Sequence, residues 1–400
     1  MNHIVVLGGS FAGINAAFEL ELELGSAAEI TVVSRDPRFV FVPSLIWMVP
    51  GWRKPGQISM QLEPILYRRG IKFKHATIEH IDPEQNKVFT DKGEIPYDYL
   101  LIGTGAKYNF SVVPGLGPDE GTSHSVCSLK HAMDSAEAWL QFVQDPGPVV
   151  IGSAQGASCF GAAYEVVFNI DRALREAKIR KQVPLAFVTS EPFLGHFGLG
   201  GMRGGESMLK GYFRMLGIKP FVNVGMTSAS KGSITLSDGR VLNHKYAIVI
   251  PPFTGVQAIF DSPGLGDEKG FIPTDDCYKH RSYDNIYAAG IAVQIKPQIP
   301  TEVPTGVPKT GWMSEVMGKV AAHNIVAAIQ GSEPRPMPFA DIKPLCIMDA
   351  GNQGMIIVLD RVFKPRRYEI MIPGPWSHWA KLAFEKYYML RIKHGLVYLP

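Results

Sequence analysis

Cysteine is scarce in this chain of 400 residues, and the scarcity excludes one class of fold. Only Cys127, Cys159, Cys277 and Cys346 are present. So few thiols in so long a chain cannot form the disulfide framework of a small secreted domain. We therefore expect a hydrophobic core, which a chain of this length with 46% hydrophobic residues can build as two or three domains.

Long apolar runs and a strong net charge are also missing. No segment approaches the roughly 18 consecutive apolar residues that a membrane-spanning helix needs. The first residues run directly into a strand pattern, so we expect no cleavable signal peptide. The formal net charge is only +3, and Lys and Arg do not cluster with aromatic residues. Nucleic acid is therefore not an expected partner.

A glycine-rich turn follows the first predicted strand. The apolar run 4–7 predicts a buried strand, helical periodicity begins at Ile14, and the run 30–33 predicts a second strand. Such a unit of about 30 residues is typical of a dinucleotide half-fold, in which the helix N-terminus holds a pyrophosphate. The turn contains Gly8, Gly9, Ser10, Phe11, Ala12 and Gly13. Ser10 replaces the usual middle glycine, and no acid ends the second strand, so Ser34 or Arg35 takes the ribose role, or Asp36 does so one turn further on.

Three further strands end at glycine. Residues 99–102 precede Gly103-Thr104-Gly105, residues 148–151 precede Gly152, and residues 285–289 precede Gly290. This order predicts an α/β protein with two Rossmann-like domains, one inserted in the other. We expect a discontinuous first domain at 1–115 and 270–330, a second at 116–269, and a C-terminal region at 331–400. The glycine-rich segment 195–205 is either a flexible loop near a site or a surface loop.

These features together resemble the two-dinucleotide-domain flavoproteins and, among them, the sulfide:quinone oxidoreductases. The resemblance covers nearly the whole chain and rests on four segments besides the glycine turns. They are Val126-Cys127-Ser128-Leu129, the segment Gln155 to Glu165 with Cys159, the segment Val307 to Glu315 with Pro308-Lys309-Thr310-Gly311, and the lone Cys346.

The resemblance implies FAD as cofactor, hydrogen sulfide as electron donor and a membrane quinone as acceptor. Cys159 and Cys346 would form the redox pair, although 187 residues separate them (346 − 159). Cys127 would either attach to the flavin or assist with sulfide, and Cys277 is interpreted as structural. Cys159 opens a predicted helix, which favours its thiolate. Cys346 lies in an apolar run that would by itself indicate an inert thiol.

The same resemblance implies further site residues. Beside the first turn, FAD would contact Ile78, Thr104, Gly105, Gly290, Lys309 and Gly311, with Lys309 stabilising negative charge on the reduced flavin. The quinone would stack on Phe384 and accept a hydrogen bond from Lys381, opposite Leu345 and Ile347. His131 and His196 would lie on the sulfide or proton path. No metal is expected.

Apolar and aromatic residues recur at helical spacing near the C-terminus. From Trp376 they follow at Trp379, Ala380, Ala383, Tyr387 and Leu390, with Lys381, Lys386, Arg391 and Lys393 nearby. This pattern is typical of an interfacial membrane anchor, and the resemblance implies a monotopic protein on the membrane surface. The alternative is a helix packed on its own protein.

The second glycine turn predicts a degraded nicotinamide site. It reads Gly152-Ser153-Ala154-Gln155-Gly156, and no acid ends the next strand before Glu191. We expect hydrosulfide to attack a bridge between Cys159 and Cys346, and the released thiolate to pass two electrons to the flavin. Alternatives are a flavocytochrome c-type sulfide dehydrogenase subunit, a type II NADH:quinone oxidoreductase and a non-enzymatic flavin-binding protein. The quinone type, the flavin linkage, the membrane face and the existence of a homo-oligomer stay open.

Overall fold

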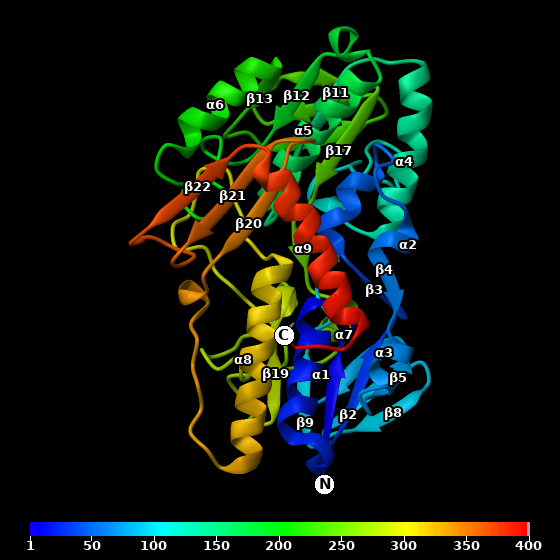
Figure 1. The fold of residues 1–400 in the computed structure, drawn as a ribbon, viewed down its shortest axis with the longest axis vertical. Helices are drawn as coiled ribbons and strands as arrows, with labels where there is room; N and C mark the ends of the chain where they lie inside the picture. The colour runs from blue at the N-terminus through cyan, green and yellow to red at the C-terminus, as the bar shows by residue number, and fades with distance from the viewer. Residues whose placement is uncertain (398–400) are drawn as a thin grey trace.

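A parallel five-stranded sheet forms the core of one half of the molecule. This half contains the N-terminus and the first glycine-rich turn. The structure is a computed structural model that describes residues 1–397. The strand order is β19 (Ile286–Ala288), β9 (Tyr99–Ile102), β1 (Asn2–Leu7), β2 (Ala28–Ser34) and β5 (Lys72–His75). Helices α1 (Phe11–Leu24) and α8 (Gly311–Gln330) pack on each other beside it (Figure 1). The strands predicted at 4–7, 30–33 and 99–102 are confirmed, and the strand predicted at 285–289 is present as the shorter β19.

Smaller elements surround this sheet. They are β3 (Arg38–Val40) with β4 (Ser59–Gln61), α2 (Pro55–Ile58), α3 (Glu63–Tyr67), and the antiparallel sheet β6 (Ile78–Asp82), β7 (Lys87–Thr90) and β8 (Gly93–Pro96). A 3-10 helix, η2 (Val42–Met48), leads away toward the second half of the molecule.

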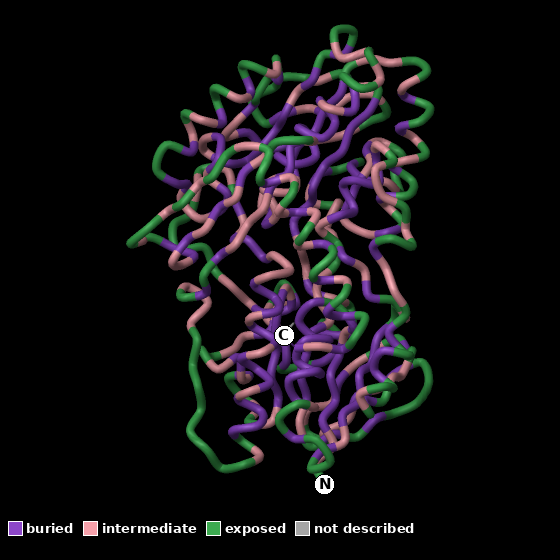
Figure 2. Tube along the Cα trace, viewed as in Figure 1, coloured by how far each residue is buried: buried purple, intermediate pink, exposed green. Residues whose placement is uncertain are grey.

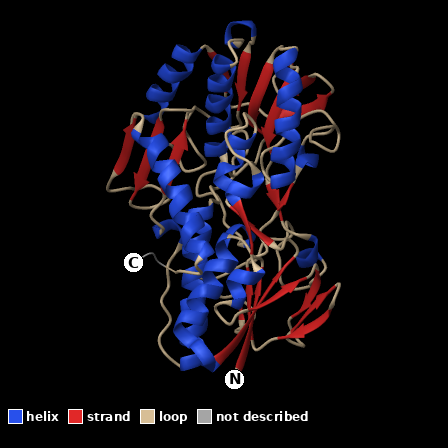
Figure 3. Cartoon of the chain, turned by 45° about the vertical axis from the view of Figure 1, so that its right-hand side comes forward, coloured by secondary structure: helices blue, strands red, loops and turns tan. Residues whose placement is uncertain are grey.

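A second parallel sheet lies at the other end of the elongated molecule (Figure 1). Its order is β13 (Ile218–Phe221), β12 (Leu185–Val188), β11 (Val149–Ser153) and β17 (Tyr246–Ile250). Helices α4 (Leu129–Gln144), α5 (Phe160–Glu176) and α6 (Gly205–Leu216) flank it (Figure 3), and β14 (Met226–Ser230), β15 (Ser233–Leu236) and β16 (Val241–Asn243) form an antiparallel appendage. Two short antiparallel strands, β10 (Lys107–Tyr108) and β18 (Phe253–Thr254), connect the halves, followed by α7 (Gln257–Phe260).

The chain therefore leaves the first sheet after β9, builds the second sheet, and returns to the first at β19. This path agrees with the predicted insertion of one Rossmann-like domain in another; the domain limits themselves stay a prediction. Buried residues concentrate along the two sheets (Figure 2), because parallel strands covered on both faces must be apolar throughout.

A third, antiparallel sheet and a long helix follow α8. The sheet contains β20 (Leu345–Asp349), β21 (Gly354–Leu359) and β22 (Glu369–Pro373), and α9 spans Trp376–Lys393. Helix α9 runs diagonally across the junction of the two halves (Figure 1). Its Tyr388 and Ile392 join the core of the first half, and its Leu382 packs on the core of the second. Within residues 1–397, none of the helices combines the length and the apolar composition that crossing a bilayer requires.

Candidate active site

The turn after β1 is shaped to bring backbone close to a ligand. Gly8 has a φ of +104°, and a Cβ there would stand 2.2 Å from the carbonyl oxygen of Gly103. A Cβ on Gly13 would stand 1.9 Å from the carbonyl oxygen of Gly8. Only glycine fits at either position. The N-terminus of α1 thereby packs directly against the ends of β1 and β9, as the sequence predicted for a pyrophosphate site.

The other predicted cofactor residues gather at the carboxyl edge of the same parallel sheet, where doubly wound folds bind ligands. Ser34 ends β2, Gly103-Thr104-Gly105 follows β9, and Gly290 follows β19 against Ala12 and Ser314 of the two helix N-termini. Within residues 1–397, the buried Thr104 hydroxyl has no hydrogen-bond partner. An orphaned buried hydroxyl beside two helix N-termini fits a dinucleotide bound at this edge. Ile78 is half-buried at the start of β6, and Arg35 is exposed.

Lys309 lies two residues before α8, in contact with the loop after β19. Its Nζ donates to the carbonyl oxygens of Ile291 and Val293 at 3.0 and 2.8 Å, and it stands 3.8 Å from the centre of the Phe271 ring. Burial lowers the pKa of Lys309 to about 7. The side chain can therefore gain or lose its charge near neutral pH, which fits the predicted role beside a group that becomes negative on reduction.

The corresponding turn in the second sheet is filled by the chain itself. The Gly156 N–H donates to the carbonyl oxygen of Pro304 at 2.6 Å, and the Gly306 N–H donates to that of Ala157 at 2.8 Å. The Gln155 side chain bonds both the N–H and the carbonyl of Met226 at 3.0 Å. The loop 301–306 therefore covers the turn that would hold a nicotinamide dinucleotide.

Glu191 follows β12, where a working nicotinamide site would present an acid to the ribose. Here the carboxylate is completely buried and accepts hydrogen bonds from Tyr164 Oη (2.8 Å), Thr189 Oγ1 (2.8 Å) and the Phe197 N–H (2.6 Å). Burial raises the pKa of Glu191 to about 7. Because its oxygens are directed at groups of the same chain, Glu191 fixes the loop after β12 and is not available to a ligand.

The structure brings Cys159 and Cys346 to one place. Cys159 is the N-cap of α5, as the sequence predicted, and Cys346 lies on β20, which packs on α5. The Sγ of Cys346 stands 3.9 Å from the position that a Cβ on Gly161 would take. The two thiols also influence each other electrostatically, since the charge of Cys159 raises the pKa of Cys346.

Cys127 lies near Cys159, just before α4. Its charge interacts with that of Cys159, and its carbonyl oxygen accepts a hydrogen bond from Tyr108 Oη. The predicted path residue His131 is one turn into α4; its ring centre lies 6.1 Å from that of Tyr108, and its Nδ1 is buried without a partner within residues 1–397. Cys127 and Cys346 are therefore both close enough to Cys159 to interact with its charge, and His131 lies beside Tyr108, which interacts with Cys127 and Cys159 as well.

Burial opposes the predicted activation of the Cys159 thiolate. The Ala162 N–H favours the thiolate, as expected at a helix N-terminus, but burial outweighs it and raises the pKa of Cys159. Burial likewise raises the pKa of Cys127 and of Cys346 to about 12. The thiols therefore need a neighbouring group that accepts their protons.

Such a group is present, and the sequence argument did not identify it. Glu165 lies one helical turn after Gly161 on α5 and is buried with its carboxylate paired to Lys381 of α9. Its Oε1 also accepts the Asp349 N–H at 3.1 Å. Burial, opposed by Lys381, raises the pKa of Glu165 to about 7. A lysine 216 residues away is invisible to local spacing, so only the fold shows this pair.

Asp349 continues the polar cluster toward the surface. Its carboxylate accepts hydrogen bonds from Trp47 Nε1 at 2.9 Å and contacts His378 Nδ1 at 2.9 Å. Asp349 is completely buried, whereas the His378 side chain is 26% exposed. The ammonium of Lys381 lies 4.8 Å from the centre of the Trp47 ring.

Helix α9 exposes large apolar side chains on one side and buries several polar and charged side chains on the other. Its exposed side carries Trp376 (68% exposed), Trp379 (67%), Tyr387 and Leu390, the face that the sequence predicted. Its inner side carries the buried polar residues Ser377, Lys381, Glu385 and Arg391. Lys381 and Arg391 were expected beside the exposed face, and this expectation is wrong: Lys381 pairs with Glu165 and Arg391 with Glu315. Of the basic residues near this face, Lys386 and Lys393 are exposed.

The predicted quinone residues lie near this helix. Phe384 is half-buried against the rings of Phe41 and Tyr388, at 5.9 and 5.8 Å between centres, and Leu345 and Ile347 on β20 are half-buried. Lys381 is only 2% exposed. A quinone oxygen would have to share this lysine with the Glu165 carboxylate.

His196 lies in the glycine-rich loop 195–205, which is held firmly. Its Nδ1 accepts the Gly198 N–H at 3.2 Å, burial lowers its pKa, and Arg366 donates to the carbonyl oxygens of Leu199 and Gly201. The loop is therefore packed under the third sheet and is neither a free surface loop nor a loose lid.

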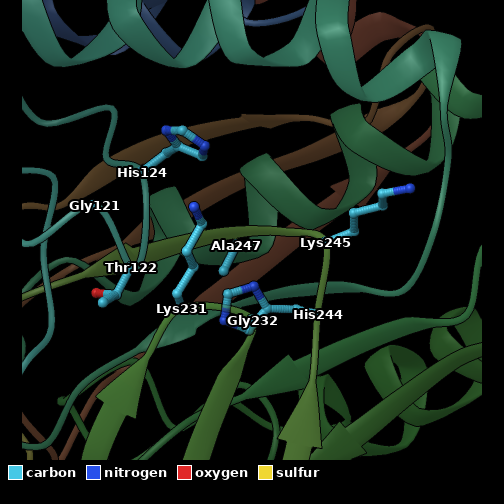
Figure 4. Close-up of a pocket in the computed structure, with 8 residues that line it drawn as sticks. All are labelled: Gly121, Thr122, His124, Lys231, Gly232, His244, Lys245 and Ala247. Carbon is cyan, nitrogen blue, oxygen red and sulfur yellow. The ribbon is translucent and has the colours of Figure 1, made fainter.

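A pocket of about 270 Å³ lies elsewhere, on the second half (Figure 4). His124, His244, Lys231 and Lys245 line it, and Lys245 points toward its ion-pair partner Asp145. None of the predicted site residues lines this pocket, so it does not bear on the cysteine chemistry.

Comparison with known proteins agrees with this geometry. A family model described as pyridine nucleotide-disulphide oxidoreductase matches residues 2–309. The sulfide-quinone reductase of Aquifex aeolicus (strain VF5) is 35% identical over 403 residues, which cover 98% of this chain and 91% of that protein. The mitochondrial sulfide:quinone oxidoreductase of Dictyostelium discoideum is 26% identical over 308 residues, 72% of this chain and 64% of that protein.

The same relationship appears in three dimensions. The X-ray structure of the sulfide:quinone oxidoreductase from the hyperthermophilic bacterium Aquifex aeolicus superposes with a TM-score of 0.94 at 34% identity, covering 99% of this chain and 92% of that one. The chain thus belongs to the pyridine nucleotide-disulphide oxidoreductase family and, within it, to the sulfide-quinone reductases.

Proposed function

We propose that this protein oxidises hydrogen sulfide at Cys159 and Cys346 and delivers the electrons through FAD to a membrane quinone. The observation that carries the proposal is the packing of β20 on α5, which brings close together two cysteines separated by 187 positions. The fold and the closeness to the Aquifex aeolicus sulfide-quinone reductase support it.

FAD would lie along the carboxyl edge of the first sheet, held by the turn 8–13, Ser34, Thr104 and Gly290. When bound, it would supply a two-electron acceptor on one side and a two-electron donor on the other. Hydrosulfide would attack a sulfur bridge between Cys159 and Cys346, and one cysteine would leave as the thiolate while the other keeps the added sulfur. Cys127, which lies near Cys159, would take part in sulfur handling.

The closed second turn argues against the type II NADH:quinone oxidoreductase alternative. The loop 301–306 occupies the turn at Gly156, and Glu191 is directed inward. The electron donor would therefore reach the flavin from the cysteine side.

The exposed face of α9 supports association with a membrane surface. Soluble helices usually bury their apolar residues, whereas α9 buries the charged residues Lys381, Glu385 and Arg391 and exposes two tryptophans. Exposed Ile370 and Ile372 on β22 lie next to this helix and enlarge the apolar surface. A quinone could then enter near Phe384 from the membrane without crossing water.

The membrane contact is tested with vesicles of mixed neutral and anionic phospholipids. Because burying a large apolar side chain contributes about 1.5–3 kcal/mol, Trp379→Ser should weaken vesicle binding roughly tenfold or more. Leu140→Ser, which removes a 70% exposed residue of α4, is the matched control and should bind like the unmodified protein. Equal binding by both variants would exclude α9 as the membrane contact.

The reaction is tested by sulfide-dependent reduction of a short-chain ubiquinone. Cys159→Ser and Cys346→Ser should abolish turnover, because neither variant can form the sulfur bridge. Cys277→Ser, at a half-buried thiol in a turn of the first domain, should leave the rate unchanged. Full activity in either of the first two variants, or bleaching of the flavin by NADH alone, would overturn the proposal.

A further inference from the structure

The pocket of about 270 Å³ on the second half of the molecule is lined mainly by basic side chains (Figure 4). Within residues 1–397, none of its lining residues is acidic. Beside four basic residues the lining contains only small ones. The complete lining is Gly121, Thr122, His124, Lys231, Gly232, His244, Lys245 and Ala247. A pocket with several basic groups and no carboxylate of its own has the composition of an anion site.

The pocket lies at the opposite edge of the second sheet from the glycine turn at Gly156. That turn follows the carboxyl end of β11, whereas His244 precedes β17 and Ala247 is the second residue of β17. Because β11 and β17 are parallel neighbours, these positions lie at opposite ends of the strands. The pocket is therefore separate from the turn that the loop 301–306 covers, and it is not a remnant of a nicotinamide site.

Backbone hydrogen bonds join the three segments that form the pocket. The His124 N–H donates to the carbonyl oxygen of Ala247 at 2.7 Å, and the His244 N–H donates to that of Gly232 at 2.8 Å. The ring of His124 also stacks on the ring of Tyr246, with 4.7 Å between their centres. The two histidines are therefore held in place before a ligand arrives, which lowers the entropic cost of binding one.

The two lysines of the pocket differ in their partners. Lys245 is paired with Asp145, and its side chain points away from the other lining residues (Figure 4). Lys231 lies in the turn between β14 and β15 and extends in the direction of His124 in the same view. In the part of the chain that the structure describes, the Lys231 ammonium has no ion-pair partner. One positive charge of the pocket is thus uncompensated.

The two imidazoles are uncharged at neutral pH. Burial lowers the pKa of both, and the charge of His124 lowers the pKa of His244 further, to about 4. Asp134 of α4 opposes the shift at His124. Nε2 of His244 is buried without a hydrogen-bond partner within residues 1–397. Because a buried polar atom without a partner is costly, a ligand that bonds to this ring would stabilise the protein.

We propose that this pocket binds a tetrahedral oxyanion of the phosphate or sulfate type, held by the Lys231 ammonium and by ring N–H groups of His124 and His244. The free anion and the phosphate group of a nucleotide present the same chemistry to these groups. A negative charge beside an imidazole favours its protonated form, so binding would take up protons from solvent. The site is remote from the cysteines and goes beyond sulfide oxidation.

The test is isothermal titration calorimetry of the flavin-loaded protein with sodium sulfate, at an ionic strength held constant with chloride. Sulfate stays doubly charged from pH 6 to pH 8, so any pH dependence belongs to the protein. We expect saturable binding that is tighter at pH 6 than at pH 8, because the imidazoles are protonated more easily at the lower pH. The binding heat should also vary with the ionisation enthalpy of the buffer, which reports the proton uptake.

Lys231→Met removes the uncompensated ammonium. Because hydrogen bonds to charged groups are strong, we expect this variant to bind sulfate about tenfold or more weakly. Lys219→Met is the matched control, since Lys219 is exposed on β13, the other edge strand of the same sheet, and it should bind like the unmodified protein. His244→Gln keeps an N–H donor but cannot take up a proton, so it should reduce both the pH dependence and the proton uptake.

The same titration with inorganic phosphate and with adenosine monophosphate distinguishes the two sources of the anion. Tighter binding of the nucleotide, weakened by Lys231→Met, would identify a nucleotide site, whereas tighter binding of phosphate would identify a site for the free anion. Absence of saturable binding of all three anions, or equal binding by Lys231→Met and the unmodified protein, would refute the site. Because none of these measurements uses sulfide, such a failure would leave the proposed function untouched.

Discussion

Replacing Glu191 with glutamine should remove a large part of the pH dependence of stability. Burial raises the pKa of Glu191 from 4.5 to about 7 in the folded protein. Between these values the folded state binds the proton more tightly than the unfolded state. The stabilisation is therefore complete below pH 4.5 and is lost as the pH rises to about 7. At about 1.4 kcal/mol per pH unit, the loss is about 3 kcal/mol.

Glutamine fits the site because each hydroxyl that now donates to Glu191, on Tyr164 and Thr189, can rotate and accept from the amide. For a domain of 150–250 residues about 3 kcal/mol corresponds to roughly 6–12 °C in Tm. Thermal unfolding followed by circular dichroism at pH 5 and pH 8 measures the difference. Glu206→Gln, at an exposed carboxylate of α6, is the control. If Glu191→Gln loses as much Tm between these pH values as the unmodified protein, the buried carboxylate is not what couples stability to pH.

Further predictions concern other buried charges and the closed turn. Lys381→Met alone should lower the free energy of unfolding in urea by about 3–5 kcal/mol, because it leaves Glu165 buried without its partner. The double variant Glu165→Met/Lys381→Met should regain most of that loss. Equal stabilities of the single and the double variant would show that the pair is not coupled. Lys309→Met should make the flavin midpoint potential more negative in a redox titration. The difference from the unmodified protein should be larger at pH 6 than at pH 8, because the pKa of Lys309 is about 7 and its charge is present mainly at the lower pH. A difference that does not change with pH would place Lys309 away from the flavin. NADH should not bleach the flavin, because Gly156 is bonded to the loop 301–306, and rapid bleaching would show that this loop opens.

Strands and glycine turns could be predicted from the sequence because their signals are local. The strands β1, β2, β9 and β11 are buried on both faces and therefore appear as continuous apolar runs. Gly13 is required by a contact within the same turn, with the carbonyl oxygen of Gly8, and Gly8 has a φ of +104°. The N-cap position of Cys159 was predicted for the same reason, since a helix start is a local feature.

The features that the sequence did not predict correctly depend on contacts between distant segments. The pKa of Cys159 is set by burial under β20, and this contribution exceeds the helix N-terminal effect that the sequence shows. The helical spacing from Trp376 to Leu390 identifies a face of α9, but periodicity cannot say whether that face is inside or outside. Lys381 and Arg391 were misplaced because their partners, Glu165 and Glu315, lie 216 and 76 residues away.

The buried charges of α9 explain how one helix can serve both half-reactions. Lys381 joins it to α5 beside the cysteines, Glu385 to Arg53, and Arg391 to Glu315 of α8 beside the first sheet. Because these ion pairs fix the rotation of the helix about its own axis, they also determine that Trp379 points outward. A helix held only by apolar packing would have to bury the residues that the membrane contact needs. The internal ion pairs therefore allow the apolar face to remain free, and they keep Lys381 paired with Glu165 beside the cysteines.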